Sequence, residues 1–300
     1  MQYDDEGFVS AKDGTRLFWG ERGEGPAIVL NDGIGCDGFA WKYLQPHLAA
    51  DHRVVHWHYR AHGRSGLPVD VGRIDVPAHA RDLLSVLDAR QIDRAVLVGH
   101  SMGTQVALET YRLAPERVRG FILVCGSYGK VTATFHGSDV LKQVLPTIID
   151  AVEKNQGLAR ALWGRIPAKL AFQLARFSKE VDALNIREDD FRPYMEHVSA
   201  MEPRLFLAML RFAGEHTAED ILDRIDVPTL VIAAERDTFT PCPLAEHMAE
   251  AIPGAEIFVL RGASHAAPIE QPDAIQARID DFLDRTEAHE PLALPQKDAS

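Results

Sequence analysis

The chain has 300 residues, of which 46% are hydrophobic and 25% are charged, as is typical of a globular protein that buries a sizeable core. A formal net charge of -12, with no run of Lys and Arg, excludes the usual phosphate-binding surface of nucleic-acid-binding proteins and disfavours attachment to an anionic membrane. The length fits one large α/β domain or two ordinary domains.

The N-terminal residues and the cysteines bear on where the protein is found. Residues 1–6 lack the basic and then apolar order of a secretory signal, and no apolar stretch approaches the roughly 18 residues that span a bilayer. Cys36, Cys125 and Cys242 are odd in number and far apart, so they predict neither a disulfide framework nor a metal site. We therefore expect a cytoplasmic protein, while a secreted chain whose signal has been removed stays open.

The first elements along the chain predict a β-hairpin, because Phe8–Ala11 and Thr15–Trp19 flank the turn signal Asp13-Gly14. After the hairpin, short and continuous apolar runs alternate with helical stretches, which is the pattern of a parallel sheet covered on both faces by helices. The predicted strands are Ala27–Leu30, Val54–Tyr59, Ala95–Val98, Phe121–Cys125, Thr229–Ala233 and Ile257–Leu260. The predicted helices between the early strands are Ala40–Leu48, Val76–Leu87 and Met102–Leu113.

The alternation of strands and helices stops near residue 126 and resumes near residue 227. The intervening segment is too long for a simple crossover, and it contains several amphipathic stretches. These stretches are Val140–Val152, Leu158–Trp163, Lys169–Phe177 and Arg204–Phe212. We expect a helical cap over residues 127–226, inserted into a core made of residues 1–126 and 227–285; a helical layer with no role at the site is the alternative. Residues 286–300 are polar and predict a flexible C-terminal tail.

A candidate nucleophile lies in Gly99-His100-Ser101-Met102-Gly103. Because Gly-x-Ser-x-Gly is common by chance, its context decides, and here a predicted strand enters the motif and a predicted helix leaves it. Such a sharp turn strains the backbone of the serine, and Gly99 and Gly103 leave space for the chain to pass itself. The turn predicts that Ser101 Oγ stands clear of the sheet edge; a Gly-rich turn with a solvated serine is the alternative.

A serine hydroxyl needs a base, and the chain offers thirteen histidines. His265 follows the last predicted strand, so we expect it at the same sheet edge as Ser101. The base in turn needs an acid that holds its tautomer and stabilises the imidazolium. Asp237 directly follows the strand that precedes His265, with Glu235 as a nearby rival.

The turn around Ser101, the acid after the penultimate strand and the histidine after the last strand resemble the α/β-hydrolase superfamily, over roughly residues 8–283. The resemblance implies an α/β-hydrolase fold, with a mostly parallel eight-stranded sheet flanked by helices. It also implies a catalytic triad of Ser101, Asp237 and His265 and an oxyanion hole formed by the backbone N–H groups of Ile34 and Met102. It implies no cofactor and no metal.

The chain departs from the family pattern at two places. It has Asp32-Gly33 where the family usually has His-Gly, and His58 stands where the family tends to have Asp after the next strand. Because these positions end neighbouring strands, we expect Asp32 to pair with His58, or with Arg60, and so to be held away from the oxyanion. Two unrelated surface substitutions are the alternative.

Several residues near these motifs are candidates for the pocket wall: Gly33, Cys36, His100, Trp163 and Phe239. As a single cysteine without a visible base, Cys36 fits a small pocket or core residue better than a second nucleophile. His100 adjoins Ser101, but neighbours around such a turn point apart. Large apolar residues in the predicted cap, Phe135 and Phe172 among them, favour an apolar pocket if some of them face the sheet.

The sequence therefore predicts a serine hydrolase that cleaves an ester-type bond of a small, hydrophobic acyl substrate through an acyl-enzyme. Thioester hydrolysis, carbon–carbon bond hydrolysis and peracid formation by the same triad stay open. Aminopeptidase-type cleavage also stays open, with Glu180, Glu188 or Glu196 as the carboxylate for the substrate amine. A small-ligand binding protein on the same fold is the alternative from another class. The expected partner is a small molecule rather than nucleic acid, and the sequence does not choose between monomer and dimer.

Overall fold

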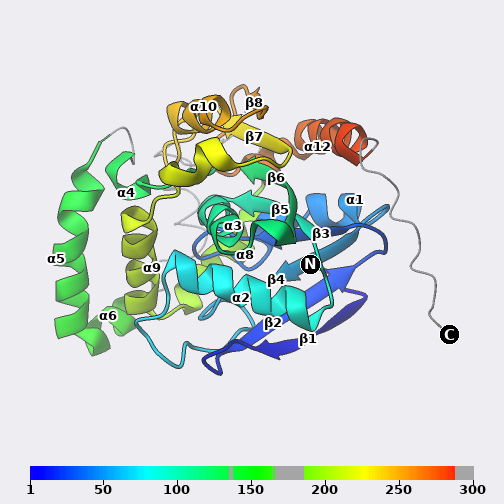
Figure 1. Cartoon of the computed structure of the whole chain (residues 1–300). Coiled ribbons are helices and arrows are strands. Elements are labelled where there is room, and N and C mark those ends of the chain that lie inside the picture. The colour runs from blue at the N-terminus through cyan, green and yellow to red at the C-terminus, as the bar shows by residue number, and fades with distance from the viewer. Residues whose placement is uncertain (135–137, 164, 166–185, 288–300) are drawn as a thin grey trace.

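The computed structural model describes residues 1–134, 138–163, 165 and 186–287 (Figure 1). Its centre is one eight-stranded sheet with the strand order β1-β2-β4-β3-β5-β6-β7-β8. β1 and β2 pair antiparallel, β2 and β4 pair antiparallel, and the other neighbouring strands are parallel. The strands are β1 Asp5–Ser10, β2 Arg16–Arg22, β3 Ala27–Asn31, β4 Arg53–Trp57, β5 Ala95–His100, β6 Val118–Val124, β7 Thr229–Ala234 and β8 Glu256–Leu260.

Helices cover both faces of this sheet, because its central strands are apolar on both sides and every residue of β5 and β7 is buried. One face packs against α2, α3 and α10, and the other against α1 and α12. The bounds of these helices are α1 Leu44–Leu48, α2 Val76–Ala89, α3 Met102–Leu113, α10 Cys242–Ala251 and α12 Pro272–Glu287, with the short α11 Ala267–Glu270 before α12. The result is the doubly wound, mostly parallel sheet that the sequence predicts.

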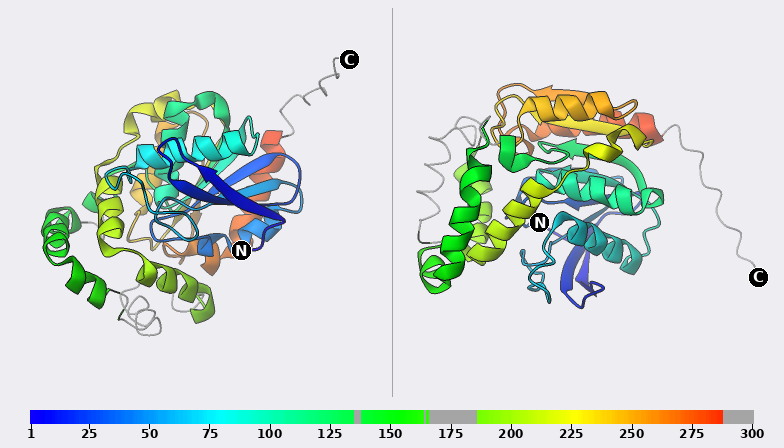
Figure 2. Two further views of the ribbon diagram at one scale, coloured as in Figure 1. Left: turned by 90° about the horizontal axis from the view of Figure 1, so that it is seen from below. Right: turned by 60° about the vertical axis from the view of Figure 1, so that its left-hand side comes forward.

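A group of helices, here called the inserted helices, lies between β6 and β7 in the sequence. Its described members are α4 Val131–Thr134, α5 Val140–Lys154, α6 Gln156–Leu162, α8 Glu188–Ala200 and α9 Pro203–Glu215. Figures 1 and 2 show α5, α6 and α9 together beside the sheet rather than on either of its helix-covered faces. α8 packs against the short helix η1 (Phe39–Trp41) that follows β3.

The structure corrects several predicted bounds. β4 ends at Trp57, so His58 and Tyr59 follow the strand instead of belonging to it. The predicted helix at residues 40–48 is divided into η1 and α1. α12 continues to Glu287, two residues into the predicted tail, while residues 288–300 lie outside the described residues. The predicted stretch Lys169–Phe177, with Phe172, and the candidate residues Phe135 and Glu180 also lie outside them.

Candidate active site

The turn between β5 and α3 has the strained geometry that its glycines predict. Ser101 stands at φ 56° and ψ -121°, a region that non-glycine residues rarely occupy. A Cβ on Gly103 would lie 2.1 Å from the Asn31 carbonyl oxygen, and a Cβ on Gly99 would lie 2.5 Å from the backbone of Gly103. The turn therefore closes only with glycine at both positions, and it holds Ser101 at the carboxyl end of β5.

Ser101, His265 and Asp237 form one chain of hydrogen bonds. His265 Nδ1 lies 2.8 Å from Asp237 Oδ2, and His265 Nε2 lies 3.0 Å from Ser101 Oγ. Because a carboxylate only accepts, Nδ1 carries the proton and donates it to Asp237, which leaves Nε2 as the acceptor for the Ser101 hydroxyl. This geometry allows the imidazole to take a proton from Ser101.

Asp237 is buried, at 5% exposure, and its carboxylate is fully used. Oδ1 accepts the backbone N–H groups of Phe239 and Thr240, and Oδ2 accepts the Thr240 hydroxyl beside His265. Burial alone would raise the pKa of this carboxyl, but the charge of His265 and these hydrogen bonds outweigh it and lower the pKa below its ordinary value. The rival, Glu235, follows β7 and accepts the N–H of Gly262, which belongs to the loop before His265.

Two aromatic rings fix the position of the His265 imidazole. The Phe239 ring lies 4.8 Å from it at an interplanar angle of 30°, and the His100 ring lies 5.0 Å from it. His100 Nε2 donates to the His265 carbonyl oxygen at 2.9 Å, so this nitrogen carries a proton and is not a base for Ser101. Burial and the nearby His265 lower the pKa of His100 to about 4, which keeps its ring neutral.

Asp32 is paired with a side chain of the neighbouring strand, as predicted, but the partner is His56 and not His58 or Arg60. Asp32 Oδ2 lies 2.7 Å from His56 Nε2, and both side chains are almost fully buried, at 1% and 0% exposure. The register explains the difference: His56 pairs with Leu30 across β3 and β4, so it lies beside the residues that end β3. Tyr3 extends the chain, because its hydroxyl lies 2.7 Å from His56 Nδ1.

The two residues that the sequence proposed for Asp32 have other partners. His58 Nδ1 accepts the N–H of Arg64 at 2.8 Å, and burial lowers the pKa of His58 to about 2. Arg60 holds Asp82 with two hydrogen bonds of 2.7 and 2.6 Å and donates a third to Asp13. Both side chains therefore stabilise the loop after β4.

The loop after β3 passes directly beside Ser101. A Cβ on Gly33 would lie 3.0 Å from Ser101 Cβ, and the Gly33 carbonyl accepts the N–H of Cys36 in a tight turn. Within the described residues, no acceptor is found for the backbone N–H of Ile34 or for that of Met102, the first residue of α3. These are the two amides that the family resemblance implies for the oxyanion hole.

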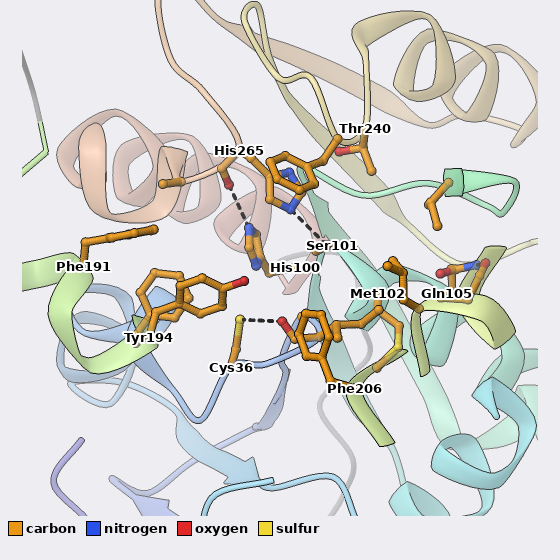
Figure 3. A pocket seen from close by; sticks show the side chains of 18 of the residues that line it. Cys36, His100, Ser101, Met102, Gln105, Phe191, Tyr194, Phe206, Thr240 and His265 are labelled. Atoms are coloured by element: carbon orange, nitrogen blue, oxygen red, sulfur yellow. Dashed lines mark hydrogen bonds between the residues drawn. The ribbon is translucent and has the colours of Figure 1, made fainter. Parts of the chain in front are cut away.

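A cavity of about 400 Å³ opens over Ser101, and residues from the core and from the inserted helices line it (Figure 3). Four predicted pocket residues, Gly33, Cys36, His100 and Phe239, lie on its wall. Its other lining residues are mostly apolar: Ile34, Phe39, Met102, Gln105, Val131, Leu141, Phe191, Tyr194, Met195, Phe206, Leu210, Ala213, Thr240 and Ala266. Burial raises the pKa of the Cys36 thiol well above its ordinary value, which disfavours a thiolate nucleophile.

Trp163 corrects the predicted pocket. Its ring does not line the cavity; it packs on Phe206 at 5.5 Å and donates its N–H to the Val198 carbonyl at 2.8 Å. Phe191 and Tyr194 of α8 also line the cavity although they were not among the predicted pocket residues; their signal in the sequence is that Phe191, Tyr194 and Val198 recur at helical spacing in an otherwise polar helix. Trp163 therefore supports the wall from behind.

The described residues also limit other kinds of site. Among them, no three His, Cys, Asp or Glu side chains are grouped so that they could hold a metal ion. In the same part of the chain, no helix has both the length and the apolar character needed to cross a bilayer.

Comparison with known proteins identifies the family to which the chain belongs. The model of the alpha/beta hydrolase family matches residues 28–278. A protein assigned as a carbamate hydrolase, RutD, from Azorhizobium caulinodans is 29% identical over 262 residues, which cover 86% of this chain and 91% of that protein.

Solved structures agree with this family. Est816, described as an N-acyl homoserine lactone degrading enzyme, is 26% identical, has a TM-score of 0.73 and covers 92% of this chain and 100% of its own. A thermophilic esterase from Thermogutta terrifontis shares the fold, with a TM-score of 0.77 at 22% identity over 94% of this chain and 99% of its own. The chain belongs to the α/β-hydrolase family and is a hydrolase.

Proposed function

We propose that this hydrolase cleaves ester-type bonds of small, hydrophobic acyl substrates with Ser101 as nucleophile, His265 as general base and Asp237 as the acid that orients it. The observation that carries the proposal is the bonded chain from Asp237 Oδ2 through His265 to Ser101 Oγ, with distances of 2.8 and 3.0 Å. Ser101 and His265, at one end of this series of hydrogen bonds, line a largely apolar cavity.

In the proposed reaction, Ser101 Oγ bonds to the carbonyl carbon of the substrate while its proton passes to His265 Nε2. The electron pair of the carbonyl moves to its oxygen, and the N–H groups of Ile34 and Met102 stabilise the resulting oxyanion. The intermediate collapses to an acyl-enzyme, and His265 gives its proton to the departing alcohol. Water then attacks the acyl carbonyl carbon and loses a proton to His265 Nε2. As this second intermediate collapses, the acid is released and His265 returns the proton to Ser101 Oγ.

In this proposal, the inserted helices form a cap that shapes the substrate pocket. Phe191 and Tyr194 come from α8 and Phe206 and Leu210 from α9, and all four line the cavity together with Ser101. In the view of Figure 3, Phe191 and Tyr194 lie on one side of Ser101, while Met102 and Gln105 lie on the other. An apolar wall of this kind favours an acyl chain over a charged group.

The relatives support the same bond class. The substrates in their names are a carbamate, an N-acyl homoserine lactone and, for the esterase, an ester, and each has a carbonyl bonded to a heteroatom leaving group. A lactone or carbamate fits the proposed mechanism without change, because Ser101 attacks the same carbonyl carbon.

Labelling with a fluorophosphonate probe tests the nucleophile. The wild-type protein is expected to label, Ser101→Ala is expected not to label, and Ser85→Ala, at a partly exposed helix position, is the matched control. A folded wild-type protein that does not label would overturn the proposal and favour a binding protein.

A substrate panel tests the bond class. We expect p-nitrophenyl esters with apolar acyl chains to be cleaved with higher kcat/KM than acyl-CoA thioesters, aminoacyl anilides and carbon–carbon bond substrates. A higher kcat/KM for any of those three would replace the ester assignment by that class.

A further inference from the structure

The loop that contains Ile34 is bonded by two imidazoles that the proposed reaction does not use. The Gly35 N–H donates to His62 Nε2 at 3.0 Å, and the Gly35 carbonyl oxygen lies 2.8 Å from His197 Nδ1. His62 follows β4, whereas His197 belongs to α8 of the inserted helices. Gly35 is thus bonded to the core through its N–H and to an inserted helix through its carbonyl.

The partners of His197 determine its tautomer. Nε2 accepts the backbone N–H of Gly63 at 2.7 Å, so this nitrogen has no proton. Nδ1 faces a carbonyl oxygen, which only accepts, so Nδ1 carries the proton and donates to Gly35. A neutral imidazole with its proton on Nδ1 is therefore the form that satisfies both neighbours.

A line of hydrogen bonds leads from His197 to the Ile34 N–H through two peptide units. The Gly35 carbonyl that accepts from His197 belongs to the same peptide as the Cys36 N–H. That N–H donates to the Gly33 carbonyl at 3.2 Å, and the Gly33 carbonyl belongs to the same peptide as the Ile34 N–H. Because a trans peptide points its N–H opposite to its carbonyl, each bond orients the next.

Such a series also polarises its members. A carbonyl that accepts a hydrogen bond makes the N–H of its own peptide a better donor, so bonds in a chain strengthen one another. α8 contacts the same loop directly, since a Cβ on Gly35 would lie 2.7 Å from the Val198 side chain. The orientation of the Ile34 N–H therefore depends on where α8 holds His197.

We propose that His197 is a positioning residue that couples α8 to the oxyanion hole, by orienting and polarising the Ile34 N–H through the peptides of Gly35 and Gly33. This inference rests on the proposed function, in which Ile34 is one of the two oxyanion donors. It gives the inserted helices a role in rate as well as in substrate choice.

Two matched variants separate the two bonds of His197. The side-chain amide of His197→Asn replaces Nδ1 and keeps the donor to Gly35, whereas the side-chain carbonyl of His197→Gln replaces Nε2 and keeps only the acceptor for Gly63. We expect His197→Asn to retain kcat within about threefold and His197→Gln to lose about tenfold, less than the roughly 100-fold cost of a missing oxyanion donor. KM is expected to change by less than about twofold in both, because the ground-state carbonyl needs this donor least.

The control is Asp189→Asn, at an exposed position of the same helix, which should behave like the wild-type protein. A trifluoromethyl ketone, which forms an oxyanion on Ser101, should bind His197→Gln about tenfold more weakly than His197→Asn, while a carboxylic acid product binds both equally. Equal kcat in His197→Gln and Asp189→Asn, with a wild-type enzyme that labels at Ser101, would overturn this inference alone. Loss of labelling in the wild-type protein would overturn the proposed function and this inference with it.

Nitrogen-15 NMR of the wild-type imidazoles tests the arrangement without any variant. The expected signal for His197 near neutral pH is the neutral tautomer with the proton on Nδ1. A proton on Nε2 would contradict the bonds to Gly63 and Gly35, and it would overturn the inference even if both variants failed to fold.

Discussion

Asp32 and His56 face each other across the ends of β3 and β4, with 2.7 Å between Oδ2 and Nε2, and water reaches neither side chain. The second carboxylate oxygen of Asp32, Oδ1, is buried and has no hydrogen-bond partner within the described residues. Asp32 also immediately precedes Gly33, whose peptide carries the Ile34 N–H. The pair therefore places a buried carboxyl group close to the proposed oxyanion site and ties it to an imidazole on the neighbouring strand.

Removing His56 should destabilise the fold strongly. His56→Leu leaves the Asp32 carboxylate buried without a partner, which we expect to cost about 3 to 5 kcal/mol in the free energy of unfolding. The matched control is His47→Leu, because His47 pairs with Asp280 at the surface, where the two side chains are 35% and 47% exposed. That change should cost less than about 1 kcal/mol. Urea denaturation measures both, and an equal effect of the two variants would contradict the argument.

The turn at Ser101 makes a second prediction about stability. Gly103→Ala places a methyl group 2.1 Å from the Asn31 carbonyl oxygen, which is backbone and cannot turn aside. We expect a loss of about 3 kcal/mol and a fall in fluorophosphonate labelling, because the turn must open. Gly157→Ala is the control: nothing lies within 4 Å of the new methyl group in α6, and stability should rise by about 0.5 kcal/mol. A thermal melt of each variant gives the answer.

Buried neutral histidines predict a loss of stability in mild acid. The pKa values of His58, His62 and His100 are lowered from 6.5 to about 2, 3 and 4, in each case mainly by burial. The unfolded chain therefore takes up protons below about pH 6.5 that the folded protein does not bind until near pH 4 or lower. Stability contributed by these groups falls as pH falls through this window, and the three imidazoles alone supply a slope that approaches about 4 kcal/mol per pH unit.

Urea midpoints between pH 7 and pH 5 test this slope, and His58→Asn is the informative variant. Its side-chain carbonyl can still accept the N–H of Arg64, but it has no proton to gain, so the slope should fall by about 1.4 kcal/mol per pH unit. A pH-independent midpoint over this range would show that these imidazoles are already charged in the folded protein.

The size of the cavity predicts a limit on acyl-chain length. Leu210 of α9 lines the cavity, and Leu210→Trp fills part of it. We expect kcat/KM for a p-nitrophenyl octanoate to fall by about tenfold, with less than a twofold change for the acetate. Leu158→Trp, at a position of α6 that is 60% exposed, should change neither. An equal fall in kcat/KM for the acetate and the octanoate would show that the octanoyl chain does not bind beside Leu210.

The apolar runs in the sequence are enough to predict the strands of the sheet and which residues follow them. Asp237 and His265 were identified because each follows an apolar run, and parallel strands bring such residues to one edge. The same reasoning failed where register decides: His56 and His58 lie on the same face of one chain segment, and only the pairing with Leu30 selects His56 as the partner of Asp32. No periodicity in one sequence contains that information.

The inserted helices were harder to predict for a different reason. Phe191, Tyr194 and Val198 recur at helical spacing on α8, but an apolar stripe does not tell whether its residues face the substrate cavity or only pack among the inserted helices. The bonds of His197 go to the backbone of Gly35 and Gly63, and a backbone partner leaves no mark on the sequence.

The attachment of α8 to Gly35 also bears on how this enzyme can change its substrate. Leu141 of α5 and Leu210 of α9 line the cavity, and we expect them to vary with the acyl chain, whereas Phe206 of α9 also lies 3.2 Å from the position of a Cβ on Gly35. α8 is different, because a shift that admits a bulkier substrate also moves His197. New specificities should therefore arise first on α5 and α9, and a homologue that displaces α8 would have to orient its oxyanion loop by another contact.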